Sequence, residues 1–237
     1  MKKFWNWVTN ETGGDELRID GYITADDFWG FLYECTTPSE FKQELDAHKG
    51  DITVWINSTG GETIAASRIY TMLREYKGKV TVKIDGIAAS AASVIAMSGK
   101  EVLMSPTSML MIHNPLVGIT GEVADLEQAI HMLNECKESI VTAYQLKSGL
   151  SRAKISRLMD AETWMNARAA VEYGFADGML YGDIDETEPV ITDRMTTIAA
   201  TAGALRKMYT RTTPPSPQQQ PGTSISSLDK RLSLIVH

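Results

Sequence analysis

Apolar and polar residues alternate in several short runs along the chain, and alternation of this kind predicts β-strands. Between these runs, apolar residues recur three or four positions apart, which predicts amphipathic helices. The predicted strands cover 17–23, 51–56, 79–84, 101–104 and 108–112, and the predicted helices cover 38–47, 62–75, 88–97, 122–147, 151–158 and 167–173. Residues 1–15 show neither pattern and are expected to form a loop. Strands that alternate with helices predict an α/β domain with mostly parallel strands and flanking helices.

The predicted helix at 122–147 is the longest of the set, and Gly149 is expected to end it. It carries a single apolar stripe at helical spacing, made of Val123, Leu126, Ile130, Leu133, Ile140 and Tyr144. Such a stripe can be covered by the rest of its own domain or by a partner protein, and the pattern does not distinguish the two.

The character of the sequence changes after residue 187. Residues 1–187 hold the predicted strands and are expected to form one domain, with a motif-bearing core at 51–180. Residues 188–211 can form one further helix. The segment PPSPQQQPG at 214–222 cannot pack a core, so 212–237 is expected to be a disordered tail rich in Pro, Gln and Ser.

Composition excludes several classes of function. The formal net charge of the 237 residues is −7, which disfavours binding to nucleic acid. Cys35 and Cys136 lie far apart with no CxxC spacing, so we expect no disulfide framework, no metal site and a reducing, cytoplasmic setting. No apolar run approaches the roughly 18 residues of a membrane span, and no signal-peptide hydrophobic region is found near Met1. We therefore expect no membrane partner.

Ser90 is the first candidate for chemistry. It follows a predicted strand and Gly86, within a run of small residues that opens a predicted helix. A serine at such a junction lies near free backbone N–H groups, which favour developing negative charge, and its small neighbours allow a substrate to approach. The alternative is structural: an Ala/Ser run also lets a helix pack closely on a sheet.

His113 is the candidate base among four histidines, because it ends an apolar strand immediately before Asn114-Pro115. Edges of open α/β sheets form ligand crevices, although a histidine at a strand end can also be merely hydrogen-bonded there. Gly60-Gly61 likewise ends a predicted strand and precedes a predicted helix. Glycines there can let backbone N–H groups face a ligand, or they can form an ordinary strand-to-helix turn. The chain has 30 acidic residues, so the residues alone do not identify a third triad member. GxGxxG, GxxxxGK[ST], HExxH and GxSxG patterns are all absent, which leaves nucleotide cofactors without support.

Four blocks in the stretch from Ile56 to Asp177 resemble the proteolytic subunit of the Clp protease, a self-compartmentalised serine peptidase. They are INSTGG at 56–61, GIAAS at 86–90, MIHNP at 111–115 and ARAAVEYG at 167–174. The family patterns that they resemble are INSPGG, GxAAS, MIHxP and AxEAVEYG. Order and spacing agree over about half of the chain. The resemblance implies the ClpP/crotonase-like fold of stacked, mostly parallel strands, a ring-type homo-oligomer and no cofactor.

The resemblance also implies roles for individual residues. Ser90 would be the nucleophile, His113 the general base, and the N–H groups of Gly60 and Ala91 the oxyanion hole. Counting from His113 without gaps places the triad acid at Glu162, where the family usually has Asp; Asp160 is the alternative acid.

Further details are closest to the Clp-like head maturation proteases of tailed phages and prophages. Thr59 replaces the usual Pro, and the N-terminal segment does not resemble the loops that meet an unfoldase ATPase. The phage-like details are KFWNW at 3–7, Trp55, SAAS at 90–93 and ETW at 162–164. This resemblance implies an ATP-independent endopeptidase that cleaves capsid or scaffold proteins in the bacterial host cytoplasm. The alternatives are a general Clp peptidase subunit that needs an unfoldase ATPase, and an inactive scaffold or structural assembly protein.

Overall fold

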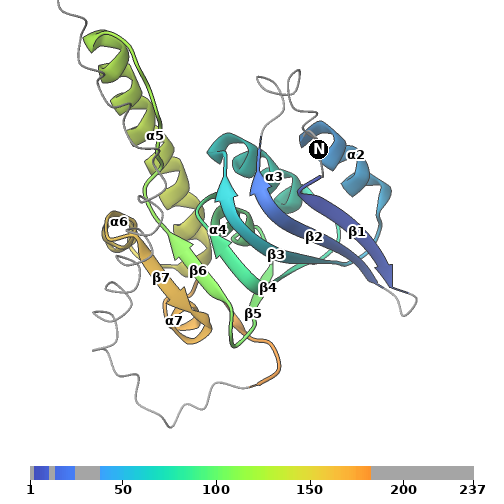
Figure 1. Ribbon diagram of the computed structural model, residues 1–237. Coiled ribbons are helices and arrows are strands. Elements are labelled where there is room, and N and C mark those ends of the chain that lie inside the picture. Colours follow the sequence, from blue (N-terminus) through green and yellow to red (C-terminus); the bar gives the residue numbers. More distant parts are fainter. Residues whose placement is uncertain (1–2, 11–13, 25–37, 183–237) are drawn as a thin grey trace, which may run out of the picture. The chain divides into compact units, whose positions relative to one another are not determined.

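The computed structural model describes residues 3–10, 14–24 and 38–182, in which strands and helices alternate as the sequence predicts (Figure 1). The strands are β1 (Trp5–Asn10), β2 (Gly14–Ile23), β3 (Ile52–Gly61), β4 (Val80–Ala89), β5 (Glu101–Met104), β6 (Met109–Ile112), β7 (Thr163–Asn166) and β8 (Gly178–Met179). The helices are α2 (Pro38–Ala47), α3 (Thr63–Glu75), α4 (Ala91–Ala96), α5 (Val123–Ser148), α6 (Arg152–Asp160) and α7 (Ala167–Glu172). The predicted α/β class is therefore confirmed.

The strands form one sheet in the order β1-β2-β3-β4-β5-β8, to which β6 and β7 are added through β4. Two pairs are antiparallel, β1 with β2 and β6 with β7, and the other pairs are parallel. Strand β4 is shared: Thr81–Ile84 pair with β5, whereas Ile87–Ala89 pair with β6. The sheet therefore divides along β4, and the second half of β4 leads directly into Ser90.

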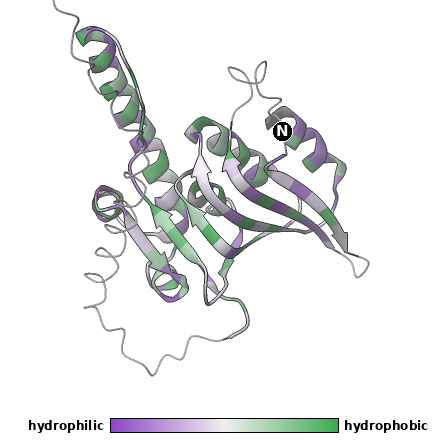
Figure 2. Cartoon of the chain, viewed as in Figure 1, coloured by the Kyte–Doolittle hydropathy of each residue, from purple (hydrophilic) through white to green (hydrophobic). Residues whose placement is uncertain are grey.

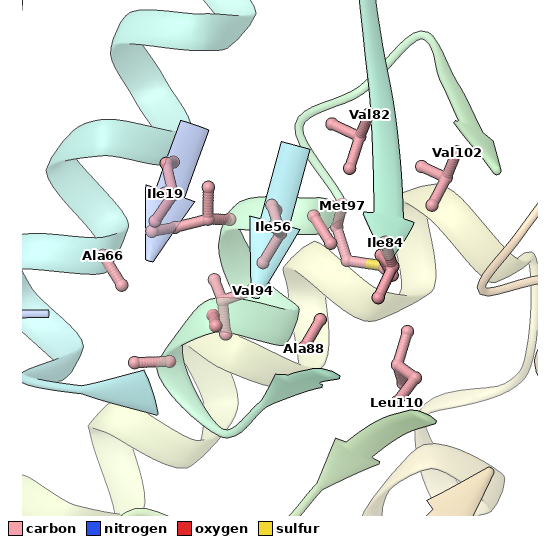
Figure 3. Packing of buried hydrophobic residues seen from close by; sticks show 14 of the residues in the cluster. Ile19, Ile56, Ala66, Val82, Ile84, Ala88, Val94, Met97, Val102 and Leu110 are labelled. Carbon is pink, nitrogen blue, oxygen red and sulfur yellow. The ribbon is translucent and has the colours of Figure 1, made fainter. Parts of the chain in front are cut away.

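The core lies where α3 and α4 pack on one face of the sheet. Alternate residues of the central strands are fully buried, and Figure 3 draws Ile19 next to Ala66 of α3, Ile56 next to Val94 of α4 and Ile84 next to Met97. Burying one such aliphatic side chain contributes about 1.5–3 kcal/mol relative to leaving it exposed. Repeated along several strands, this burial fixes the register that positions the residues at the strand ends.

Several predicted boundaries are wrong, for a common reason. The helix predicted at 88–97 begins only at Ala91, because Ala88 pairs with both Ser58 and Leu110 as a strand residue. Strand pairing here overrides the helix propensity of alanine. Strand β3 likewise continues through Gly61, where a turn was expected.

Residues 5–10 form strand β1, although a loop was expected for 1–15. The segment is short, but its antiparallel pairing with β2 buries the Trp5 side chain. The short strands β7 and β8 are absent from the prediction altogether. The predicted helix at 188–211 and the tail at 212–237 lie outside the described residues, which all belong to the unit Met1–Thr192.

The long helix α5 has two different halves. In its C-terminal part Ile140, Val141, Ala143 and Tyr144 are buried, whereas Ala129 is the one buried side chain among residues 123–139. Of the six residues of the stripe predicted from the sequence, only Ile140 and Tyr144 are thus buried, and Figure 2 shows hydrophobic positions along the exposed half of α5. Within the described part of the chain, no helix combines the length and apolar character that crossing a membrane requires.

Candidate active site

Ser90 occupies the junction between β4 and α4. Its backbone has φ 54° and ψ −125°, a sparsely populated conformation for a residue with a side chain. The Ser90 N–H donates to the Met111 carbonyl over 3.0 Å, so β6 holds the junction from the side. Such strain costs about 1–3 kcal/mol and persists where surrounding contacts determine it, which is typical of functional positions.

The pairing of β4 with β6 brings His113 to Ser90. Ala89, the last residue of β4, lies opposite Met111 in this parallel register, and β6 ends one residue later, directly before His113. His113 Nε2 lies 2.7 Å from Ser90 Oγ. A neutral imidazole with its proton on Nδ1 would accept the serine hydroxyl proton at this distance, as a general base must.

The β6–β7 register brings Glu162 close to His113. Ile112 pairs with Thr163 in this antiparallel ladder, so Glu162, directly before β7, lies beside His113, directly after β6. Glu162 has φ 48° and, like Ser90, is a non-glycine residue in the left-handed region. Among the described residues no hydrogen bond joins it to His113; its Oε1 accepts one from the Trp164 indole at 3.4 Å.

Two opposing influences act on the pKa of His113. Burial of the ring lowers this pKa, because a buried imidazole loses the hydration of its charged form. The nearby Glu162 carboxylate opposes that shift by stabilising the imidazolium. The net direction is downward, so the ring is held in the neutral state that accepts a proton at neutral pH.

Asp160, the alternative acid, is engaged elsewhere. Its Oδ1 accepts hydrogen bonds from Lys137 at 2.6 Å and from the Asn114 amide at 2.9 Å. These bonds, led by that from Lys137, lower the pKa of the carboxyl. Asp160 is exposed at the end of α6 and ties the residue after His113 to α5.

Gly60 lies against the nucleophile. A Cβ added at this position would come within 2.7 Å of both the Ala89 carbonyl and Ser90 Cβ, and 3.0 Å from Ala91 N. Its φ of +101° is also one that side chains rarely adopt. The Gly60 N–H donates to Ser58 Oγ over 3.1 Å in this structure. The absence of a side chain at Gly60 therefore allows β3 to lie close to the junction at Ser90.

Sequence reasoning missed a buried polar pair behind Ser90. Ser93 Oγ donates to the Ser90 carbonyl over 2.6 Å, and it lies 2.7 Å from the Tyr144 hydroxyl. Tyr144 belongs to the apolar stripe of α5, and the spacing of the stripe does not predict a role for its hydroxyl. A serine three residues after a candidate nucleophile was the one available signal.

Within residues 3–10, 14–24 and 38–182, no three His, Cys, Asp or Glu side chains gather as a metal site would require. A serine hydroxyl on a strained strand-to-helix junction, in contact with a half-buried histidine whose pKa is lowered, instead defines the class of serine hydrolases.

Comparison with known proteins narrows this class. The Clp protease family pattern matches residues 42–182. The "ATP-dependent Clp protease proteolytic subunit 1" of Chlamydia abortus is 34% identical over 179 residues, 73% of this chain and 82% of that protein. The "ATP-dependent Clp protease proteolytic subunit" of Bacteroides fragilis is 35% identical over 132 residues, 55% of this chain and 64% of that protein. The chain belongs to the Clp protease family and is a serine-type peptidase.

Proposed function

We propose that this peptidase is an ATP-independent endopeptidase that cleaves capsid or scaffold proteins during maturation of phage heads. The observation that carries the catalytic part is the 2.7 Å contact between Ser90 Oγ and His113 Nε2. The phage role is supported by sequence details alone, namely the KFWNW run at 3–7, Trp55, the SAAS run at 90–93 and the ETW run at 162–164.

In the proposed reaction, Ser90 Oγ attacks the scissile carbonyl carbon while His113 Nε2 takes the hydroxyl proton. The peptide C–N bond then breaks, and the imidazolium returns the proton to the leaving amine. Water attacks the resulting acyl-enzyme with His113 again acting as base, which regenerates Ser90. The Ala91 N–H, next to the nucleophile, and the Gly60 N–H would stabilise the oxyanion, the latter after releasing Ser58 Oγ.

We assign the triad acid to Glu162. Its charge stabilises the His113 imidazolium, whereas the Asp160 carboxylate is engaged by Lys137 and Asn114. A hydrogen bond from His113 Nδ1 to Glu162 would form when substrate or a partner subunit brings the two together. Catalytic hydrogen bonds are often long in a protein without substrate and tighten in the complex.

Self-assembly is part of the proposal. Val123, Leu126 and Ile130 project from the exposed half of α5 with 70%, 43% and 60% of their surface accessible. Apolar side chains gathered on one exposed helix mark an interaction surface more often than a solvent-facing one. Enclosure of the active sites by further copies of the chain would keep this peptidase from digesting unrelated proteins.

Two rival functions each have one observation in their favour. The relatives from Chlamydia abortus and Bacteroides fragilis are named as subunits of an ATP-dependent protease, which favours a general peptidase that works with an unfoldase ATPase. Among residues 3–10, 14–24 and 38–182 no carboxylate forms a hydrogen bond with His113, which favours an inactive scaffold protein.

The first test is labelling with a fluorophosphonate probe followed by peptide mapping. We expect an adduct on Ser90 that is lost in His113→Ala. An unlabelled protein that nevertheless assembles fully would favour the scaffold role. If the probe labels Ser90, fresh protein that has not met the probe is then incubated with purified capsid and scaffold proteins without ATP. Cleavage only after an unfoldase and ATP are added would favour the general Clp peptidase.

A further inference from the structure

The peptide unit that joins Ser90 to Ala91 has a hydrogen-bonding role at each end. Its carbonyl, on Ser90, accepts two hydrogen bonds from the same residue: 2.6 Å from Ser93 Oγ and 3.0 Å from the Ser93 N–H. Its N–H belongs to Ala91, the proposed oxyanion donor. Anything that binds the carbonyl therefore acts on the donor through one rigid, conjugated amide.

The direction of the bonds behind this carbonyl follows from counting protons. The Ser93 hydroxyl has one proton, and it donates this proton to the Ser90 carbonyl, which can only accept. The Tyr144 hydroxyl, 2.7 Å from Ser93 Oγ, must therefore be the donor in that contact. The order of donation is Tyr144 to Ser93 and Ser93 to the Ser90 carbonyl, and the Ala91 N–H lies at the other end of the same peptide unit.

This chain of donors is entirely buried. Ser93 has no exposed surface and Tyr144 has 1%. Burial raises the pKa of the Tyr144 phenol, so this residue stays protonated and remains a donor at any working pH. Phe175 packs edge-on against the Tyr144 ring with centroids 5.5 Å apart, which fixes the ring independently of its hydroxyl.

We propose that Ser93 and Tyr144 are positioning residues that fix and polarise the Ser90–Ala91 peptide, so that its N–H stabilises the oxyanion. The inference rests on the proposed catalytic role of Ser90 and Ala91. Donation to a carbonyl withdraws electron density from its amide and makes the N–H at the other end a stronger donor. The two bonds to the carbonyl also hold the peptide plane, and with it the direction of the Ala91 N–H.

The effect belongs to the transition state, because charge appears on the substrate oxygen only there. Loss of a whole oxyanion donor costs about 10²–10³ in rate, so weakening and loosening one donor is expected to cost roughly tenfold. Loss of the Tyr144 hydroxyl, one bond further away, is expected to cost roughly threefold. Affinity for the probe and the proton equilibrium of His113 stay unchanged.

The experiment uses the full chain and measures the saturating rate of fluorophosphonate labelling (kinact), the probe affinity (KI) and the pH profile of each. The test variants are Ser93→Ala and Tyr144→Phe. The chain offers matched controls in Ser98→Ala and Tyr76→Phe, because the hydroxyls of Ser98 and Tyr76 are buried without a hydrogen-bond partner in the described structure. Thermal melting of every variant records the cost in stability separately.

We expect kinact to fall about tenfold in Ser93→Ala and about threefold in Tyr144→Phe, with KI and the acid-limb pKa unchanged and both controls near wild type. The double variant should be no slower than Ser93→Ala, because Tyr144 acts through Ser93. Should Ser93→Ala fail to fold, the comparison of Tyr144→Phe with Tyr76→Phe decides, again by a fall in kinact with KI and the acid-limb pKa unchanged.

Test variants that label as fast as their controls would overturn the inference while leaving the peptidase assignment intact. A shifted acid-limb pKa would also overturn it, since that result places the effect on the Ser90–His113 contact. A wild-type protein that takes up no probe would refute the proposed catalytic role itself, and this inference with it.

Discussion

The side-chain amide of Asn114 donates a hydrogen bond to Asp160 Oδ1 over 2.9 Å, directly beside the candidate base. The carboxylate that could have completed a triad is therefore turned toward the residue after His113 and toward Lys137. The carboxylate that raises the pKa of His113, against the lowering by burial, is that of Glu162. The two acids can be told apart by isosteric substitution.

Glu162→Gln is expected to lower the rate of fluorophosphonate labelling by roughly 10²–10⁴, because the imidazolium that forms in the reaction loses its stabilising charge. Asp160→Asn is expected to cost less than about fivefold, since exposed ion pairs contribute little. The measurement is the second-order labelling rate at pH 8. A larger loss in Asp160→Asn than in Glu162→Gln would reverse the assignment of the acid.

The pH dependence of labelling follows from the lowered pKa of His113. Labelling needs the neutral imidazole, so its acid limb should have a midpoint below the ordinary histidine value of 6.5. Removal of the Glu162 charge in Glu162→Gln should move this midpoint further down, because that charge raises the pKa. A midpoint above 6.5, or an upward shift in the variant, would contradict the burial argument.

Stability should respond to pH in the same sense. The folded-state pKa of His113 lies below the unfolded value, so between the two the unfolded chain binds more protons. This group therefore adds no penalty above about pH 6.5 and destabilises the fold as the pH falls below that value. Comparison of urea unfolding of wild type and His113→Gln at pH 7.5 and pH 5.5 isolates the contribution. A difference between the two proteins that does not change with pH would refute it.

The sequence singles out Ser90 and His113 as candidates because each follows a predicted strand whose apolar residues are visible locally. The position of Glu162 beside His113 depends on the pairing of β6 with β7, between residues about 50 positions apart. Strand β7 has only four residues, which is too short for an alternating pattern to predict it. The end of β4 was predicted as helix because alanine favours helices locally, while its strand partners lie elsewhere in the chain. Tyr144 and Ser93 are 51 residues apart, so only folding brings their hydroxyls together.

Gly60→Ala tests the close approach of β3 to the nucleophile. The added methyl group would meet the Ala89 carbonyl and Ser90 Cβ at 2.7 Å and would force a side chain onto a φ of +101°. We expect a loss of stability of about 1–3 kcal/mol and little Ser90 labelling. Gly118→Ala is the matched control, because nothing lies within 4 Å of its added Cβ. A Gly60→Ala protein that melts and labels like this control would show that the junction is loose.

Self-association should depend on the exposed half of α5. Ile130 is 60% exposed, and its burial against another copy would contribute about 1.5–3 kcal/mol, so Ile130→Asp should weaken each contact by at least about tenfold. The neighbouring exposed residue His131 provides the control, since His131→Asp adds a carboxylate on the same helix without removing an apolar side chain. Sedimentation velocity distinguishes the 26.1 kDa chain from larger assemblies. Equal assembly of wild type and both variants would place the self-association surface elsewhere, whereas loss in both would reveal a response to charge alone.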